Sequence, residues 1–332
     1  MQRILTGIQS TGIPHLGNLL GALIPAIGMS KKSQGSCFFL IADLHALTTQ
    51  HTNKARAQLS YAVAASWLAL GLDTKKHILY RQSNIPEVCE LAWYLNCFTP
   101  YPMLANAHAF KDKSSQLAQV NAALFTYPVL QAADILLYDA THIPVGKDQQ
   151  QHLEITRDIA RIINQYYPNL FVVPQATVQE KVAIIPGTDG RKMSKSYGNT
   201  INIFLPEREL KQAIMHIQTD STPLETSKNP DTCPVFKLYS LLATQQAIAI
   251  MRKQYLAGGY GYGDAKKELF SCIINRFKNA RKRYNHYLEN IDQLEEILCA
   301  HEEKARTIAR TKMKIIRQAL GYSAEASTLY AR

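Results

Sequence analysis

The residues Cys37-Phe38-Phe39-Leu40-Ile41-Ala42 form one continuous apolar stretch. A run of this length without polar alternation is typical of a strand with both faces buried in a parallel sheet. Helical spacing follows it, because Leu59, Val63 and Trp67 recur every four residues. Similar short apolar runs predict four further strands, at Arg3–Gly7, His77–Tyr80, Thr141–Val145 and Val182–Ile185. This alternation predicts an α/β fold with a doubly wound parallel sheet and helices on both faces.

The pattern changes after Pro206. Apolar residues then recur at helical spacing from Leu269 to Ile291 and from Ala309 to Leu320, which predicts two long amphipathic helices. The glycine-rich stretch Gly258–Gly263 is predicted to be a loop, because it lacks a preceding strand and the spacing of a dinucleotide fingerprint. We therefore predict a Rossmann-like domain over residues 1–205 and a helical domain over residues 206–332.

The composition is that of an ordinary folded chain, with 46% hydrophobic and 19% charged residues among 332. It holds no uncharged apolar stretch of about 18 residues, so we expect no membrane span. No secretion signal is visible at the N-terminus, and we expect a cytoplasmic protein. The six cysteines lack zinc-site spacing, so no metal site is predicted and the cysteines are expected to be buried hydrophobes.

The formal net charge of +11 favours a polyanionic partner. Basic residues cluster in the last third of the chain, between Arg276 and Arg283 and again between Lys304 and Arg317. An extended contact with nucleic-acid phosphates needs such a surface. Solvated helix faces would have the same composition, so charge alone leaves both interpretations open.

Two short motifs carry the chemistry. Pro14-His15-Leu16-Gly17-Asn18 lies where the first strand leads into a helix, the place where phosphates settle against helix N-termini. There His15 can donate to a phosphate, Asn18 can add a polar contact, and Gly17 lets a nucleotide base approach the backbone. The second motif, Lys192-Met193-Ser194-Lys195-Ser196, can close over a triphosphate and neutralise the charge of departing pyrophosphate. Each motif alone would also suit an ordinary polar loop.

Together the two motifs resemble the signatures of class I aminoacyl-tRNA synthetases. His15-Leu16-Gly17-Asn18 is similar to the HIGH signature, and Lys192–Ser196 is identical to the KMSKS signature. The segments Gly7–Gly12, Asp43–Thr48, Thr126–Tyr138 and Pro144–Asp158 closely resemble tryptophanyl-tRNA synthetases. In that family a doubly wound nucleotide-binding domain precedes a helical domain that reads the tRNA.

The resemblance implies roles for individual side chains. Asp134 would accept the indole N–H, while Tyr127 and Gln149 would hold the ammonium group, and Gln131 and His45 complete the implied tryptophan-binding set. The implied ATP-binding residues are Gln9, Ser10, Thr11, His15, Gly17, Asn18, Gly146, Asp148, Lys192, Met193, Ser194, Lys195 and Ser196. The implied catalytic residues are Gln9, Lys113, Lys192 and Lys195. The implied tRNA-binding residues are Arg276, Lys278, Arg281, Lys282 and Arg283.

The role of Asp134 has a physical basis. An indole offers one hydrogen-bond donor, so its pocket needs one well-placed acceptor. A site built around such a bond discriminates better than an apolar pocket, because a substrate without the donor leaves the acceptor unpaired. Two positions depart from the commonest family pattern: Lys147 stands where glutamate is frequent, and Gln131 stands where methionine often contacts the indole.

The resemblance also implies the reaction. Tryptophan would be activated with Mg-ATP to tryptophanyl-adenylate, without a covalent protein intermediate, and then transferred to the 3′ end of tRNA(Trp). The expected cofactors and partners are therefore ATP, Mg²⁺, L-tryptophan and tRNA(Trp), and the family implies a homodimer. The alternatives are a tyrosyl-tRNA synthetase, which shares a Gln-Ala-x-Asp string, and a non-catalytic RNA-binding paralogue. A small-molecule nucleotidyltransferase would not need the basic helical tail.

Overall fold

The computed structural model describes residues 2–48, 55–107, 120–146, 149–178 and 184–322. Their strands form one parallel sheet in the order β3-β2-β1-β4-β5, which confirms the predicted fold class. The strands are β1 (Ile4–Gln9), β2 (Cys37–Ala42), β3 (Ile78–Arg81), β4 (His142–Val145) and β5 (Gln175–Val178). Four of them lie where the apolar runs predicted strands.

The fifth predicted strand, at Val182–Ile185, is wrong in the half of it that the structure describes. Ile184 and Ile185 belong to no strand, while residues 182 and 183 lie outside the described part of the chain. The observed fifth strand is β5, which lies at one edge of the sheet and exposes Gln175 and Ala176. An edge strand of this kind contains no buried apolar run, so the pattern that identifies central strands misses it.

Helices cover both faces of the sheet, and β2 shows why. Its alternate residues Cys37, Phe39 and Ile41 pack into one hydrophobic cluster, and Phe38, Leu40 and Ala42 pack into the other. The first cluster lies under α1 (Leu16–Asn18), α2 (Ile24–Lys32), α4 (Arg56–Ala69) and α13 (Tyr262–Glu289). The second lies under α5 (Glu87–Phe98), α6 (Tyr101–Ala105), α8 (Ala122–Leu136) and α9 (Gln150–Tyr166). A strand buried on both faces therefore needs the continuous apolar sequence that it has.

The other α-helices of the described residues are α3 (Asp43–Ala46), α10 (Glu207–Met215), α11 (Pro234–Ser240), α12 (Gln245–Ala257) and α14 (Ile291–Ala319). The predicted helix from Leu269 to Ile291 is divided, because α13 ends at Glu289 and Ile291 begins α14. The predicted loop at Gly258–Gly263 is also shorter than expected, because α13 begins at Tyr262. No helix among the described residues is long and apolar enough to cross a membrane.

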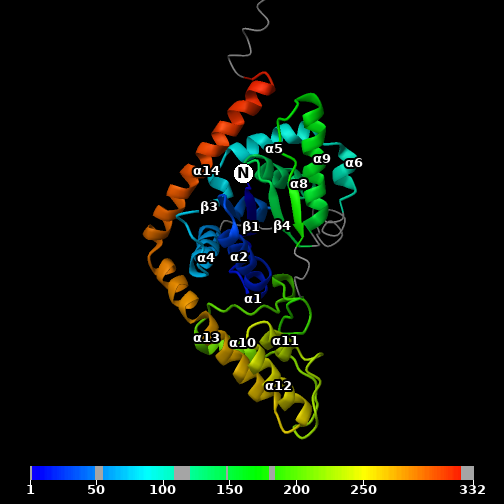
Figure 1. The fold of residues 1–332 in the computed structure, drawn as a ribbon, viewed down its shortest axis with the longest axis vertical. Coiled ribbons are helices and arrows are strands. Elements are labelled where there is room, and N and C mark those ends of the chain that lie inside the picture. The colour runs from blue at the N-terminus through cyan, green and yellow to red at the C-terminus, as the bar shows by residue number, and fades with distance from the viewer. Residues whose placement is uncertain (1, 49–54, 108–119, 147–148, 179–183, 323–332) are drawn as a thin grey trace, which may run out of the picture.

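The last helix, α14, returns from the helical part to the sheet and runs beside its β3 edge (Figure 1). An edge strand presents unpaired backbone N–H groups. Here the N–H of Leu79 donates to His301 Nδ1 at 3.4 Å, and the N–H of Arg81 donates to Glu302 Oε1 at 3.2 Å. Side chains of α14 thus replace a neighbouring strand. The division into two domains at residue 205 stays a prediction. Helices α13 and α14 both pack against elements of residues 1–205, namely α4 and β3.

Candidate active site

A cleft of about 990 Å³ opens at the carboxyl ends of β1 and β4. The sheet order reverses between these two strands, and ligands of doubly wound sheets bind at such a switch point. Of the predicted site residues, the cleft is lined by Gln9, Thr11, His15, Asn18, His45, Tyr127, Gln131, Asp134, Gly146, Gln149, Ser194, Lys195 and Ser196. Residues from distant parts of the sequence therefore meet at one place.

His15 is held at the start of α1 by a reciprocal cap with Asn18. The backbone N–H of Asn18 donates to His15 Nδ1 at 3.3 Å, and the N–H of His15 donates to Asn18 Oδ1 at 3.2 Å. Burial, with a smaller contribution from the charge of Lys195, lowers the pKa of His15 to about 4. The ring is therefore neutral near pH 7. With Nδ1 accepting, Nε2 carries the proton and can donate to a ligand in the cleft.

The loop at residues 192–196 touches this first motif directly. The backbone N–H of Gly17 donates to the buried Met193 sulfur at 3.2 Å. A Cβ at Gly17 would lie 2.9 Å from the His15 ring and 3.3 Å from Met193 Cβ, so this contact requires glycine. Neither Gly17 nor Met193 lines the cleft, and contact of a nucleotide base with Gly17 stays a prediction. The two signatures form one packed unit at the mouth of the cleft.

The two lysines of the loop lie differently. Lys195 lines the cleft, and a Cβ at Gly12 would lie 3.0 Å from its Nζ. Partial desolvation at the cleft mouth lowers the pKa of Lys195 to about 8, although the side chain is still exposed on one side. Lys192 is exposed and does not line the cleft, while its carbonyl accepts from Asn199 Nδ2 at 3.1 Å. A phosphate role for Lys192 requires movement of the loop.

At the other end of the cleft, α8 presents a polar face. Tyr127, Gln131 and Asp134 are spaced four and three residues apart, which places them on one side of the helix. Asp134 is 2% exposed, and burial raises the pKa of its carboxyl group, opposed by His45 and Gln82. His45 Nε2 lies 3.0 Å from Asp134 Oδ2. The cleft therefore ends in a buried acceptor suited to one N–H donor.

Two polar side chains at the Asp134 end of the cleft, Gln82 and His152, were not predicted from the sequence. Gln82 Nε2 donates to both oxygens of Asp134, at 2.9 and 2.8 Å. Asp134 is thus already hydrogen-bonded before any ligand arrives, which corrects the expectation of an unpaired carboxylate. His152 Nε2 lies 2.6 Å from the Tyr127 hydroxyl, and burial raises the pKa of Tyr127 to about 12. The sequence signal that could have identified Gln82 was its position two residues after the predicted strand at His77–Tyr80.

Three residues lie outside the described part of the chain: Lys113 and Asp148, which have predicted roles, and Lys147, which departs from the common family pattern. Ser10 is described, is 1% exposed and does not line the cleft. Among the described residues, no group of three or more His, Cys, Asp or Glu side chains could hold a metal ion.

The predicted tRNA-binding residues lie on α13. The guanidinium groups of Arg276, Arg281 and Arg283 donate to the carbonyls of Leu242, Ile203 and Ala69, respectively. These three arginines therefore anchor α13 within the chain. Lys278 and Lys282 are exposed. An exposed lysine can contact a phosphate without breaking an internal bond, whereas an anchored arginine has fewer donors left.

Comparison with known proteins agrees with this geometry. Residues 1–278 match the family model of class I tRNA synthetases for tryptophan and tyrosine. The chain is 44% identical to the tryptophan–tRNA ligase of Fusobacterium nucleatum, over 97% of this chain and 98% of that relative. It is similar to the crystal structure of Campylobacter jejuni tryptophanyl-tRNA synthetase complexed with ADP and tryptophan, with a TM-score of 0.91 and 43% identity over 96% and 100% of the two chains. For the Mycoplasma pneumoniae tryptophanyl-tRNA synthetase structure, the TM-score is 0.81 at 27% identity, over 98% and 99% of the two chains.

The parallel sheet, the reversal point and the two joined signatures are those of a class I synthetase. At these identities and coverages, the chain belongs to the family of tryptophan–tRNA ligases.

Proposed function

We propose that the chain activates L-tryptophan with Mg-ATP and transfers it to tRNA(Trp). One observation carries this proposal: a single cleft has His15 and Lys195, the proposed phosphate ligands, at one end and a buried carboxyl group, Asp134, at its other end. An amino acid whose side chain ends in one N–H donor, with its carboxylate directed toward ATP, fits this polarity. The relatives named as tryptophan–tRNA ligases support it, and they favour it over tyrosine.

In the proposed recognition, Asp134 accepts the indole N–H. Gln82 and His45 fix the orientation of its carboxylate. The Tyr127 hydroxyl lies 2.6 Å from His152 Nε2, and both side chains line the cleft. A hydroxyl oxygen can accept a hydrogen bond, and Tyr127 is the first proposed ligand of the tryptophan ammonium group. Gln149 lines the same cleft and is the second proposed ammonium ligand. Gln131 lies between Tyr127 and Asp134 on the pocket face of α8.

The proposed first step is an in-line displacement. A tryptophan carboxylate oxygen bonds to the α-phosphorus of ATP while the bond from that phosphorus to the bridging oxygen breaks, releasing pyrophosphate. Neutral His15 donates through Nε2, and Lys195 supplies positive charge where the leaving phosphates become more negative. In the second step the terminal adenosine hydroxyl of the tRNA takes the acyl group and AMP leaves. Positioning and charge neutralisation carry both steps.

Mg²⁺ is proposed as part of the nucleotide substrate. Mg²⁺ is commonly bound by substrate phosphates with few protein ligands, which agrees with the lack of an acidic cluster among the described residues. Lys278 and Lys282 are the proposed phosphate contacts for tRNA. We further propose a cytoplasmic homodimer. The exposed aromatic side chains of Trp93, Tyr101 and Tyr166, on α5, α6 and α9, support the dimer, since such surfaces mark interfaces.

The test is ATP–pyrophosphate exchange with L-tryptophan and L-tyrosine supplied separately. Exchange with tryptophan alone is expected. Exchange with tyrosine would overturn the role of Asp134 and keep the reaction class. Exchange with neither amino acid, from folded protein that binds ATP, would favour a non-catalytic RNA-binding role.

A further inference from the structure

A short turn after β3 joins the indole end of the cleft to the last helix. This turn, η2 (Gln82–Asn84), begins with Gln82, which is 1% exposed. Both polar ends of the Gln82 side chain are used: Nε2 donates to the two oxygens of Asp134, and Oε1 accepts the backbone N–H of His45 at 3.3 Å. A side chain held at both ends cannot rotate without breaking a bond to the pocket.

The next residue strengthens this arrangement. The N–H and hydroxyl of Ser83 donate to the Asp43 carboxylate at 2.9 and 2.5 Å. Asp43 is the first residue of α3, the helix that carries His45. The turn therefore holds both partners of Asp134, Gln82 directly and His45 through α3.

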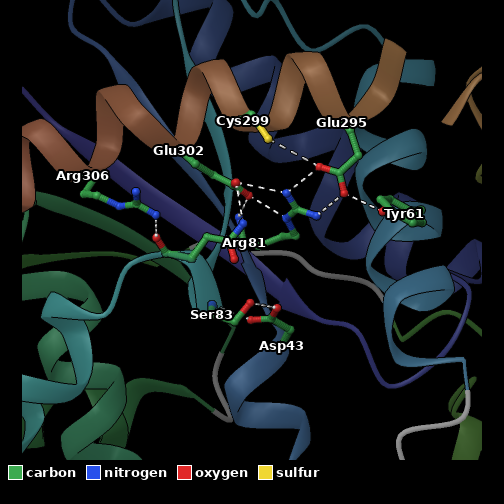
Figure 2. Close-up of polar contacts among 9 residues, drawn as sticks. Asp43, Tyr61, Arg81, Ser83, Glu295, Cys299, Glu302 and Arg306 are labelled. Carbon is green, nitrogen blue, oxygen red and sulfur yellow. Dashed lines mark hydrogen bonds and ion pairs between the residues drawn. The ribbon is translucent and has the colours of Figure 1, made fainter. Parts of the chain in front are cut away.

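On its other side, the turn is bracketed by one carboxylate of α14 (Figure 2). Glu302 Oε1 accepts from the backbone N–H of Arg81 at 3.2 Å and from its Nε at 2.6 Å, just before the turn. Glu302 Oε2 accepts from Asn84 Nδ2 at 2.6 Å, at the end of the turn. Arg306, one helical turn further along α14, donates to the Asn84 carbonyl at 2.6 Å. Gln82 lies between the two bonds to Glu302.

Glu295 provides an internal comparison on the same helix. It binds the same guanidinium, with Oε1 2.6 Å from Arg81 Nη1, and also accepts from the Tyr61 hydroxyl (Figure 2). Its hydrogen-bond partners are the side chains of Arg81, Tyr61 and Cys299, and none of them belongs to the turn. Glu302 is 3% exposed, and its bonds to a cation are of the short, directional kind. The two glutamates thus share Arg81 but differ in whether they touch the turn.

We propose that Gln82 is a specificity-determining residue of the indole pocket, and that Glu302 is a positioning residue that fixes Gln82, and through it Asp134, from the last helix. This inference rests on the proposed function. A displacement of about 1 Å in a positioned group can lower a rate by about 100-fold, so a turn tied at both ends has a direct effect on recognition.

The test compares tryptophan with its benzothienyl analogue, in which sulfur replaces the indole N–H. ATP–pyrophosphate exchange gives KM and kcat for both amino acids in wild type, Glu302→Gln and Gln82→Met, with Glu295→Gln as the matched control. Both test variants are expected to raise the KM for tryptophan about tenfold or more, with kcat changed less than about threefold, because a hydrogen bond to a charged group is weakened. Their preference for tryptophan over the analogue should shrink by a similar factor. Glu295→Gln should keep wild-type preference.

General loosening of the fold would raise both KM values equally and leave the preference unchanged, which would overturn the inference. An equal loss of preference in Glu295→Gln would also overturn it. If Glu302→Gln does not fold, Asn84→Ala removes one of the bracketing bonds without unpairing a charge, and it must reduce the preference in the same direction. Wild-type protein that shows no exchange with tryptophan would overturn the proposed function, and this inference with it.

Discussion

Replacing Lys195 with alanine should slow adenylate formation and leave tryptophan binding nearly unchanged. The Lys195 side chain lies over Gly12 at the proposed phosphate end of the cleft, and the proposed tryptophan-binding side chains of α8 lie at the other end. Loss of one preorganised group that stabilises transition-state charge lowers a rate by about 100- to 1,000-fold, or about 2.7–4 kcal/mol. We therefore expect at least about a 100-fold slower first step, with the Kd of tryptophan within about twofold of wild type.

The pKa of Lys195 gives this prediction a second, independent readout. With a pKa of about 8, Lys195 is about 90% protonated at pH 7 and about 10% protonated at pH 9 in the free protein. Since the proposed role of Lys195 requires its protonated form, kcat/KM for ATP should fall about tenfold per pH unit above pH 8. Since the pKa of His15 is about 4, protonation of His15 should not lower kcat/KM for ATP above about pH 5. Lys195→Ala should abolish the alkaline limb.

Single-turnover rapid-quench measurements across this pH range report the first step directly, and equilibrium dialysis reports tryptophan binding. Lys211→Ala, which removes an exposed lysine from α10, controls for a general loss of positive charge. An unchanged first-step rate in Lys195→Ala would refute the reasoning. So would an alkaline limb near pH 8 that persists after Lys195 is removed.

Three further predictions follow from other parts of the molecule. Asp134→Asn should lower kcat/KM for tryptophan about 10- to 100-fold. Burial raises the pKa of the Asp134 carboxyl group, so the stability that this group contributes to the folded protein is lost as the pH rises. The Tm of Asp134→Asn minus the Tm of wild type, measured by calorimetry, should therefore increase from pH 4 to 7. Glutamates at Lys278 and Lys282 should weaken tRNA charging, most strongly at low salt, while exchange stays at the wild-type rate; equal charging at all salt concentrations would count against tRNA contact. Trp93→Glu should shift the mass measured by sedimentation toward the monomer, and an unchanged mass would exclude this face from the interface.

The sequence was informative where one physical requirement determines the residues. The stretch Cys37–Ala42 predicted β2 with the observed bounds, because a strand covered on both faces has to be apolar throughout. The two signature motifs predicted where phosphates would bind, and the structure places both at one cleft mouth. An edge strand such as β5 pairs its backbone on one side only and does not have to be apolar throughout. The apolar pattern is therefore missing there, and β5 was not predicted.

The polar partners of the pocket could not be predicted for a different reason. Gln82 and Glu302 meet the site only through tertiary contacts, and 221 positions separate Arg81 from Glu302 along the chain. No periodicity or local spacing records such a contact. The sequence also could not predict that Arg276, Arg281 and Arg283 bind backbone carbonyls. A basic cluster has the same sequence pattern whether its side chains face solvent or bind carbonyls.

The acceptors that α14 provides for β3 have a consequence for the order in which the protein is made. A ribosome releases the N-terminal strands early, yet the N–H groups of Leu79 and Arg81 gain their partners only once His301 and Glu302 have been synthesised. Until then the nascent sheet has an open edge, and open edges attract other strands. Nearly the whole chain must therefore emerge before its catalytic half is complete, and a message truncated shortly before codon 301 would yield an aggregation-prone fragment instead of a smaller working enzyme.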